Sequence, residues 1–110
     1  MNNLGLAGEQ EAQKYLKKKK YKLLECNYKN KLGEIDIIAK QHNTIVFVEV
    51  KSRSSLAFGM PRESVTNHKQ QKIKQVAMCY LSLNKLSNCS VRFDVIEILN
   101  GQITHIPNAF

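Results

Sequence analysis

The chain has 110 residues, a length that suits one domain with one hydrophobic core, and we expect residues 1–110 to form that single domain. Seventeen Lys and Arg residues against nine Asp and Glu residues leave a formal net charge of +8, which favours a polyanion such as DNA, RNA or an acidic membrane surface as partner. The hydrophobic fraction of 43% argues against disorder, and no apolar run reaches the roughly 18 residues of a membrane span.

The start of the chain and its cysteines indicate a cytoplasmic protein. Met1–Leu6 lacks the apolar core of a signal peptide. Cys26, Cys79 and Cys89 are odd in number and have no Cys-x-x-Cys spacing. They therefore predict free thiols in a reducing compartment instead of a disulfide framework or a zinc site. We expect no membrane association.

The first predicted element is a helix over about Leu6–Lys19, where apolar residues such as Ala12 and Leu16 recur three and four positions apart. Glu9 precedes Ala12 by three, which places it on the buried side. Its carboxylate either faces the sheet, close to a site, or is a first-turn Glu stabilised by the helix dipole, and the spacing leaves both interpretations open. The run Lys17–Lys20 closes the helix as a solvated cationic end that adds affinity for phosphate more than chemistry.

Three strands are predicted next. The first covers Tyr21–Tyr28 and is followed by a turn at Asn30–Gly33. The second and third cover Gly33–Ala39 and Thr44–Lys51, and the polar residues Gln41–Asn43 form the turn between them. Both of the latter strands carry charge where a half-buried strand should be apolar.

Charged side chains on these two strands can converge. Asp36 lies on one face of its strand, and Glu49 and Lys51 share one face of the next, so a hairpin brings the three together. Two carboxylates and an ammonium in an apolar sheet are costly unless compensated, and a divalent metal is the usual compensation. The alternative is an exposed Glu49–Lys51 ion pair, which is worth little. The strand-borne Asp before a Val-Phe-Val-Glu-x-Lys run favours the site.

A loop is predicted over Ser52–Glu63, directly after the charged strand, where it can cover a substrate. Arg53 and Arg62 in this loop are candidate phosphate contacts, because a guanidinium matches the geometry of a phosphate.

The second predicted helix covers about Thr66–Leu83. Lys69 lies four residues before the apolar Ile73 and therefore points inward, where it can snorkel to water, reach a phosphate or meet a site carboxylate. Lys72 flanks the apolar stripe, and we interpret it as part of a basic face that attracts DNA non-specifically.

The end of the chain is predicted to form a hairpin. Val91–Ile98 alternates as a fourth strand, Asn100–Gly101 is a strong turn signal, and Gln102–Ile106 forms a short fifth strand. We interpret Asp94 as a structural residue paired with a nearby cation. The predicted order is an α/β arrangement, αβββαββ.

These motifs resemble the PD-(D/E)XK nuclease superfamily, in which an Asp on one strand and a Glu-x-Lys on the next form the site. More closely, the chain resembles the YraN family of small bacterial proteins, which is related to archaeal Holliday-junction resolvases. The matching stretches, in chain order, are Gly8-Glu9, Asn27, Gly33–Asp36, Val46–Lys51, Arg53, Phe58–Pro61, Lys69 and Ala77–Leu81. The strand-borne Asp follows Glu-Ile instead of Pro, which departs from the superfamily name but fits this family.

The resemblance implies a restriction-endonuclease-like core, with a mixed central sheet flanked by two helices. It also implies a metal-dependent nuclease that hydrolyses DNA phosphodiesters, with branched or junction DNA among the candidate substrates. The implied metal is Mg²⁺ or Mn²⁺, held by Asp36, Glu49 and the Val50 carbonyl. Lys51 would orient or help to deprotonate a metal-bound water, or stabilise the developing negative charge, and Glu9 would hold a metal-bound water or a second ion.

The implied catalytic set is thus Glu9, Asp36, Glu49 and Lys51, and the implied nucleic-acid contacts are Arg53, Arg62, Lys69 and Lys72. A homodimer is a further implication, because resolvases of this fold act as dimers. The alternative from a different class is a non-catalytic nucleic-acid-binding protein that keeps the nuclease fold. A protein-interaction adaptor would use none of the unusual charges and ranks last.

Overall fold

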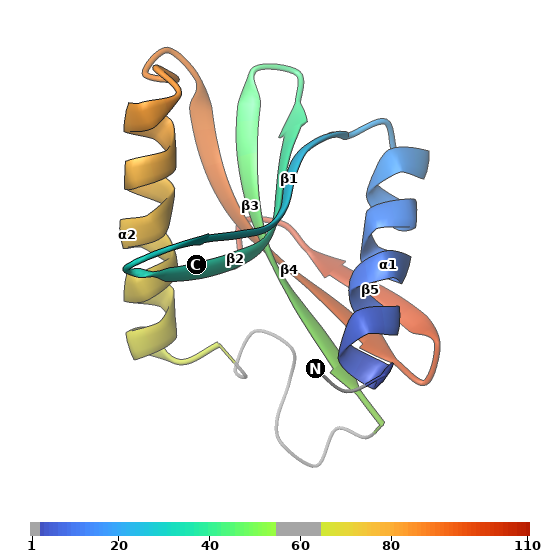
Figure 1. Ribbon diagram of the computed structural model, residues 1–110. Coiled ribbons are helices and arrows are strands. Elements are labelled where there is room, and N and C mark those ends of the chain that lie inside the picture. Colours follow the sequence, from blue (N-terminus) through green and yellow to red (C-terminus); the bar gives the residue numbers. More distant parts are fainter. Residues whose placement is uncertain (1–2, 55–64) are drawn as a thin grey trace.

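The computed structural model describes residues 3–54 and 65–110, with side chains from residue 7 onward in the first helix (Figure 1). The elements are α1 (Asn3–Lys18), β1 (Lys22–Asn30), β2 (Gly33–Gln41), β3 (Thr44–Arg53), α2 (Asn67–Leu83), β4 (Ser90–Leu99) and β5 (Gln102–Ile106). The predicted order αβββαββ is confirmed.

The predicted boundary between the third strand and the loop after it was wrong. β3 continues to Arg53, so Ser52 and Arg53 belong to the strand and not to the loop that the sequence predicts. The reason is long-range pairing, because Ser52 lies opposite Ile98 and Arg53 opposite Leu99 of β4. A pairing between segments more than 40 residues apart leaves no trace in the local pattern of either one.

The strands form one mixed sheet in the order β1-β2-β3-β4-β5. β3 and β4 are parallel, and every other neighbouring pair is antiparallel. A parallel pair needs a crossover between its strands, and α2 provides it.

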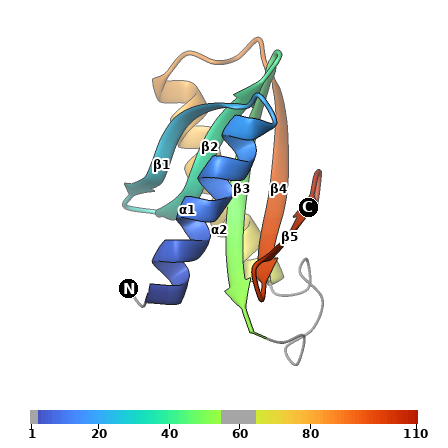
Figure 2. The ribbon, with the colours of Figure 1, turned by 90° about the vertical axis from the view of Figure 1, so that its right-hand side faces the viewer.

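The two helices cover opposite faces of the sheet (Figures 1 and 2). Side chains alternate along β3, so that Val46 and Val48 pack under α1 while Ile45 and Phe47 pack under α2. Each of these four is essentially buried, and burial of such a side chain stabilises the fold by about 1.5–3 kcal/mol. In the described part of the chain, no helix combines the length and the apolar character needed to cross a bilayer.

A buried ionic network ties β5 and the C-terminal residues to the sheet. Asp94 has no exposed surface, and its oxygens accept two hydrogen bonds from Arg92, each 2.8 Å, one from His105 Nε2 at 2.7 Å and one from the Asn108 amide at 3.0 Å. Burial acts to raise the pKa of Asp94, but these hydrogen bonds outweigh it and hold the pKa below its ordinary value. The predicted pairing of Asp94 with a cation is confirmed.

Replacing this carboxylate should destabilise the fold. Asp94→Asn leaves the Arg92 guanidinium without its counter-ion, so we expect the free energy of unfolding at pH 7 to fall by about 3 kcal/mol or more. Since the folded-state pKa is lowered, ionised Asp94 stabilises the fold above its unfolded pKa and loses this contribution as the pH falls. Urea denaturation should therefore show a difference in unfolding free energy between the wild type and Asp94→Asn that disappears in strong acid. Glu25→Gln, at an exposed position, is the control. A decrease of less than about 1 kcal/mol in the unfolding free energy of Asp94→Asn at pH 7 would contradict the expectation.

Candidate functional site

Pairing between β2 and β3 places two carboxylates side by side. Ile37 lies opposite Val48, and just beyond this pair Asp36 and Glu49 lie close enough for the charge of Glu49 to raise the pKa of Asp36. Glu49 shares one face of β3 with Phe47, the face covered by α2. Asp36 Oδ2 accepts a hydrogen bond of 2.8 Å from the Val50 amide. The structure thus brings together the carboxylates whose convergence the sequence predicts.

Two ammonium groups lie beside the Glu49 carboxylate. Lys51, on the same strand, has its Nζ 3.9 Å from Glu49 Oε1, and Lys69, on α2, has its Nζ 2.8 Å from the same oxygen. Glu49 is 6% exposed and Lys69 is 43% exposed, so this lysine reaches the site from the surface. Among the three partners that the sequence leaves open for Lys69, the structure places it on the site carboxylate.

Glu9 reaches the cluster because α1 lies very close to β3. A Cβ atom built on Gly8 would lie 1.7 Å from Ser52 Oγ, so a larger residue at Gly8 would require the Ser52 side chain to move. Glu9 Oε2 is buried and has no hydrogen-bond partner among the residues described. The first-turn alternative for Glu9 was wrong, because α1 begins at Asn3 and Glu9 lies in its second turn.

The pKa of Asp36 reflects the crowding of these carboxylates. Burial, followed by the negative charge of Glu49, raises the pKa of Asp36 to about 7, and Glu9 adds to the effect. The hydrogen bond from the Val50 amide acts in the opposite direction but does not outweigh them. Within the described ranges no ion pair neutralises Asp36. The arrangement therefore favours a proton or another cation at this position.

The pKa values of the two lysines move in opposite directions. Burial, followed by the hydrogen bond and the charge of Lys69, lowers the pKa of Lys51 in spite of the opposing charges of Glu49 and Asp36. Burial also acts to lower the pKa of Lys69, but its hydrogen bond to Glu49 and the charge of that carboxylate outweigh burial and raise it. Lys69 is thus the firmly protonated partner of Glu49, and Lys51 releases a proton more readily.

The donor atoms of the site fit a hard divalent cation. The carboxylates of Glu9, Asp36 and Glu49 and the Val50 carbonyl are oxygen ligands of the kind that Mg²⁺ and Mn²⁺ take. The unpartnered oxygen of Glu9 and the raised pKa of Asp36 are both features that a cation would relieve. Among residues 3–54 and 65–110, no three His, Cys, Asp or Glu side chains are already arranged as a metal site.

An ion pair next to the site was not predicted from the sequence. Arg53 Nε donates to Glu97 Oε2 at 2.7 Å, and the guanidinium also forms an ion pair with this carboxylate. Glu97 is 2% exposed and lies opposite Lys51 across the β3–β4 pair. The sequence does indicate that Glu97 needs a cation, because strand alternation puts its side chain on the same face as the buried Val95. Arg53, predicted to contact phosphate, is 10% exposed and is held by Glu97.

Lys72 and Glu34 form no ion pair with this cluster among the described residues. Lys72 is exposed on α2, in keeping with a basic outer face. Glu34 is exposed at the start of β2, opposite Lys29 of β1. Arg62 and the Phe58–Pro61 stretch lie outside the described residues.

Comparison with known proteins gives a consistent family match. The model of a family described as uncharacterised protein family UPF0102 matches residues 8–98. A UPF0102 protein of Clostridioides difficile (strain 630) is 54% identical, and the match covers 100% of both chains. A UPF0102 protein of Caldicellulosiruptor saccharolyticus is 53% identical over 97% of this chain and 96% of the relative. One from Persephonella marina is 45% identical over 96% of this chain and 91% of the relative.

Removing one of the crowded charges should stabilise the metal-free protein. Asp36→Asn keeps an oxygen that can accept from the Val50 amide. Since the folded-state pKa of Asp36 is raised to about 7, the stability linked to this group is present below its unfolded pKa and is lost as the pH rises through about 7. In EDTA at pH 8 we expect the variant to be more stable than the wild type by a few kcal/mol, since one pKa unit corresponds to about 1.4 kcal/mol.

Urea denaturation at pH 4.5 and pH 8 measures this effect. The difference between the variant and the wild type should be much smaller at the lower pH, where the folded wild type is protonated at Asp36. Glu34→Gln, on the same strand but exposed, is the matched control and should show little pH-dependent difference. An Asp36→Asn protein that is less stable than the wild type at pH 8 would contradict the assignment.

Proposed function

The chain belongs to the UPF0102 family, and we propose that it is a metal-dependent nuclease that hydrolyses phosphodiester bonds in DNA. As part of this proposal we assign the five-stranded mixed sheet and its two helices to the restriction-endonuclease-like folds. The support for that assignment is the Asp of β2 followed by the Glu-x-Lys of β3, on neighbouring strands and on one face of the sheet.

The observation that carries the proposal is the uncompensated charge of Asp36 within the carboxylate cluster. Asp36 is pressed against Glu49 closely enough to raise its pKa to about 7, and Glu9 contributes from a third element. A purely structural cluster would be expected to neutralise its members, as the Asp94 and Glu97 carboxylates are neutralised by arginines. Strongly shifted groups gathered in this way are typical of functional sites.

The side chains present have separate tasks in this scheme. Asp36, Glu49 and the Val50 carbonyl would hold Mg²⁺ or Mn²⁺, and Glu9 would accept hydrogen bonds from water beside them. When bound, such a cation supplies Lewis-acid polarisation of a phosphate oxygen and makes a bound water more acidic.

The two lysines complete the assignment. Lys51, whose pKa is lowered, would orient the attacking water, take up its proton when deprotonated, or stabilise charge on the phosphate when protonated. Lys69 would fix the orientation of Glu49 through their 2.8 Å contact.

The proposed partner follows from the overall charge. A formal net charge of +8 attracts a polyanion, and DNA is the polyanion on which the proposed chemistry acts. A branched substrate presents paired strands and would need two copies of the site. The apolar side chains of Met78, Leu83 and Val91 are 66%, 75% and 40% exposed, and we include in the proposal a homodimer that could use this surface.

One observation favours a second candidate function. The ammonium of Lys69 neutralises Glu49 without any metal, as it would in a nucleic-acid-binding protein that kept the fold but not the reaction. In that case the cluster would be a structural feature and the basic surface would carry the activity.

Cleavage assays separate the two functions. Labelled single-stranded, duplex, flapped and four-way-junction DNA would be incubated with Mn²⁺ or Mg²⁺, with EDTA as the blank. Asp36→Asn, Glu49→Gln and Lys51→Met should each lower the cleavage rate by about 100-fold or more while retaining DNA binding. Glu34→Gln, which changes an exposed carboxylate on β2, should cleave like the wild type.

The outcomes assign the function directly. Loss of cleavage in the three site variants, with binding intact, supports a metal-dependent nuclease. Binding by the wild type without cleavage of any substrate under every metal condition would replace the proposal with the non-catalytic function.

A further inference from the structure

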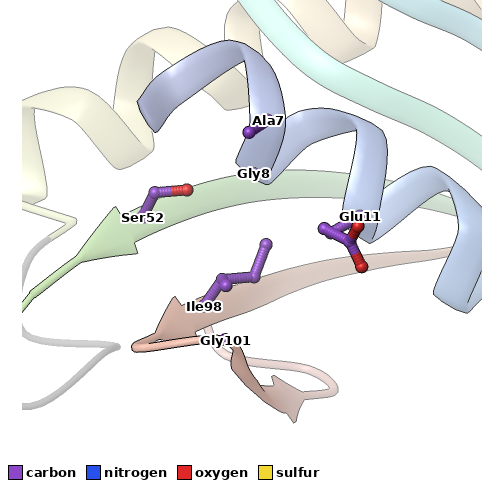
Figure 3. Close-up of a pocket in the computed structure, with 6 residues that line it drawn as sticks. All are labelled: Ala7, Gly8, Glu11, Ser52, Ile98 and Gly101. Atoms are coloured by element: carbon purple, nitrogen blue, oxygen red, sulfur yellow. The ribbon is translucent and has the colours of Figure 1, made fainter. Parts of the chain in front are cut away.

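Two hollows on the α1 side of the sheet adjoin at Glu11. The first has a volume of about 440 Å³ and is lined by Ala7, Gly8, Glu11, Ser52, Ile98 and Gly101 (Figure 3). The second has a volume of about 280 Å³ and is lined by Glu11, Lys14, Tyr15, Lys18 and Ile103. Both include Glu11, so they follow one face of α1 alongside the β4–β5 hairpin. We call this feature the α1 groove.

One end of the α1 groove lies beside Glu9, because Gly8, which lines the first hollow, directly precedes it on α1. The Ser52 side chain lies on the α1 face of β3, opposite to the face that carries Glu49 and Lys51. Ser52 Oγ is buried and has no hydrogen-bond partner among the described residues. In Figure 3 the Ile98 side chain rises from β4 towards α1, which gives the hollow an apolar floor next to this hydroxyl group.

The other end of the α1 groove is basic. Lys14 and Lys18 line the second hollow, and Lys17–Lys20 extends the positive charge beyond it. Glu11 is exposed where the two hollows join and would repel a phosphate placed directly upon it. A polyanion is therefore best accommodated with its phosphates towards the lysines and its uncharged parts inside the groove.

The apolar floor selects for bases that are free of a duplex. Ile103 is partly exposed and Ile98 is 8% exposed, and the apolar surface that they leave open can be covered by a nucleobase, which removes both surfaces from water. In a duplex the faces of the bases are already stacked on one another, whereas in a single strand they are available. The span along α1 from Gly8 to Lys18 is about 15 Å at about 1.5 Å per residue. Successive phosphates of one B-DNA strand rise by about 3.4 Å, so the groove has room for a few nucleotides.

We propose that the α1 groove binds a single-stranded segment of nucleic acid, with its bases over Ile98 and Ile103 and its phosphates on Lys14 and Lys18. The inference rests on the proposed function for its choice of a nucleic acid as ligand and adds the class of substrate. It favours flaps, overhangs and unpaired arms over an uninterrupted duplex.

Binding in EDTA tests the proposal without requiring any cleavage. Fluorescence anisotropy would compare oligo(dT) of about ten nucleotides with a hairpin duplex of similar length, across a range of salt concentrations. We expect the single strand to bind about tenfold more tightly or better. The double variant Lys14→Gln/Lys18→Gln should lose that preference. The slope of the logarithm of its association constant against the logarithm of the salt concentration should become shallower by about 1.4, since each phosphate contact on a single strand contributes about 0.7.

A matched pair of lysines away from the groove provides the control. Lys31→Gln/Lys85→Gln removes the same two charges from exposed positions and should leave the preference for the single strand intact. Lys and Gln have similar helix propensities, so the groove variant should keep α1 folded, which circular dichroism verifies. Amide chemical shifts recorded with oligo(dT) should change most at Gly8, Ile98, Gly101 and Ile103.

Several results would overturn the proposal. The first is equal affinity for the duplex and the single strand. The second is a loss of affinity in Lys31→Gln/Lys85→Gln as large as that in Lys14→Gln/Lys18→Gln. The third is that the amide chemical shifts change with oligo(dT) in α2 alone. Groove shifts that grow with protein concentration in the absence of DNA would indicate that a second copy of the chain covers it. The binding test is carried out without metal and is therefore independent of the cleavage assay. Failure to bind the single strand would not change the cleavage result, and a protein that does not cleave DNA can still be tested for binding.

Discussion

Repulsion between carboxylates in a partly buried site is the constraint on which the rest of this structure depends. Asp36 and Glu49 are fixed close together because the apolar residues around them lock the β2–β3 register from both faces of the sheet. A slip by one residue would turn each carboxylate to the other face. Gly8 brings α1 near enough for Glu9 to add a third charge. The energy that holds the cluster together therefore comes from the two hydrophobic cores and not from the cluster itself.

The molecule treats its buried acids in two different ways. Asp94 and Glu97 form ion pairs with arginines, and these pairs fix the strands on which the two carboxylates lie. Asp36 has no such partner among the described residues, and the cations that pair with Glu49 in that part of the chain are lysines, one of which reaches in from the surface. Lysine is a flexible point charge, whereas arginine forms a rigid fork, so the lysine-paired site can rearrange more easily around an incoming ligand. The difference separates the structural from the proposed functional carboxylates within one small sheet.

Strand alternation was enough to predict the positions of Asp36, Glu49 and Lys51, because neighbouring antiparallel strands joined by a short turn have few ways to pair. It also indicated that Lys69 points inward, although the partner depends on how α2 crosses the sheet. The Arg53–Glu97 pair was not predicted from the sequence, because its two residues are 44 positions apart and meet through the parallel β3–β4 pairing. The steric need for glycine at Gly8 likewise depends on the contact between α1 and β3, which local sequence does not encode.

The central claim is that the Asp36–Glu49 cluster is a divalent-cation site, and titration of Mn²⁺ into the metal-free protein at pH 7.5 tests it most directly. Calorimetry should detect saturable binding by the wild type and by Glu34→Gln. Asp36→Asn and Glu49→Gln should each abolish this binding. The same Mn²⁺ should raise the unfolding free energy of the wild type by about 2.7 kcal/mol at a concentration 100 times the dissociation constant. Equal Mn²⁺ binding by the wild type and the two site variants, or no binding by any of them, would contradict the account.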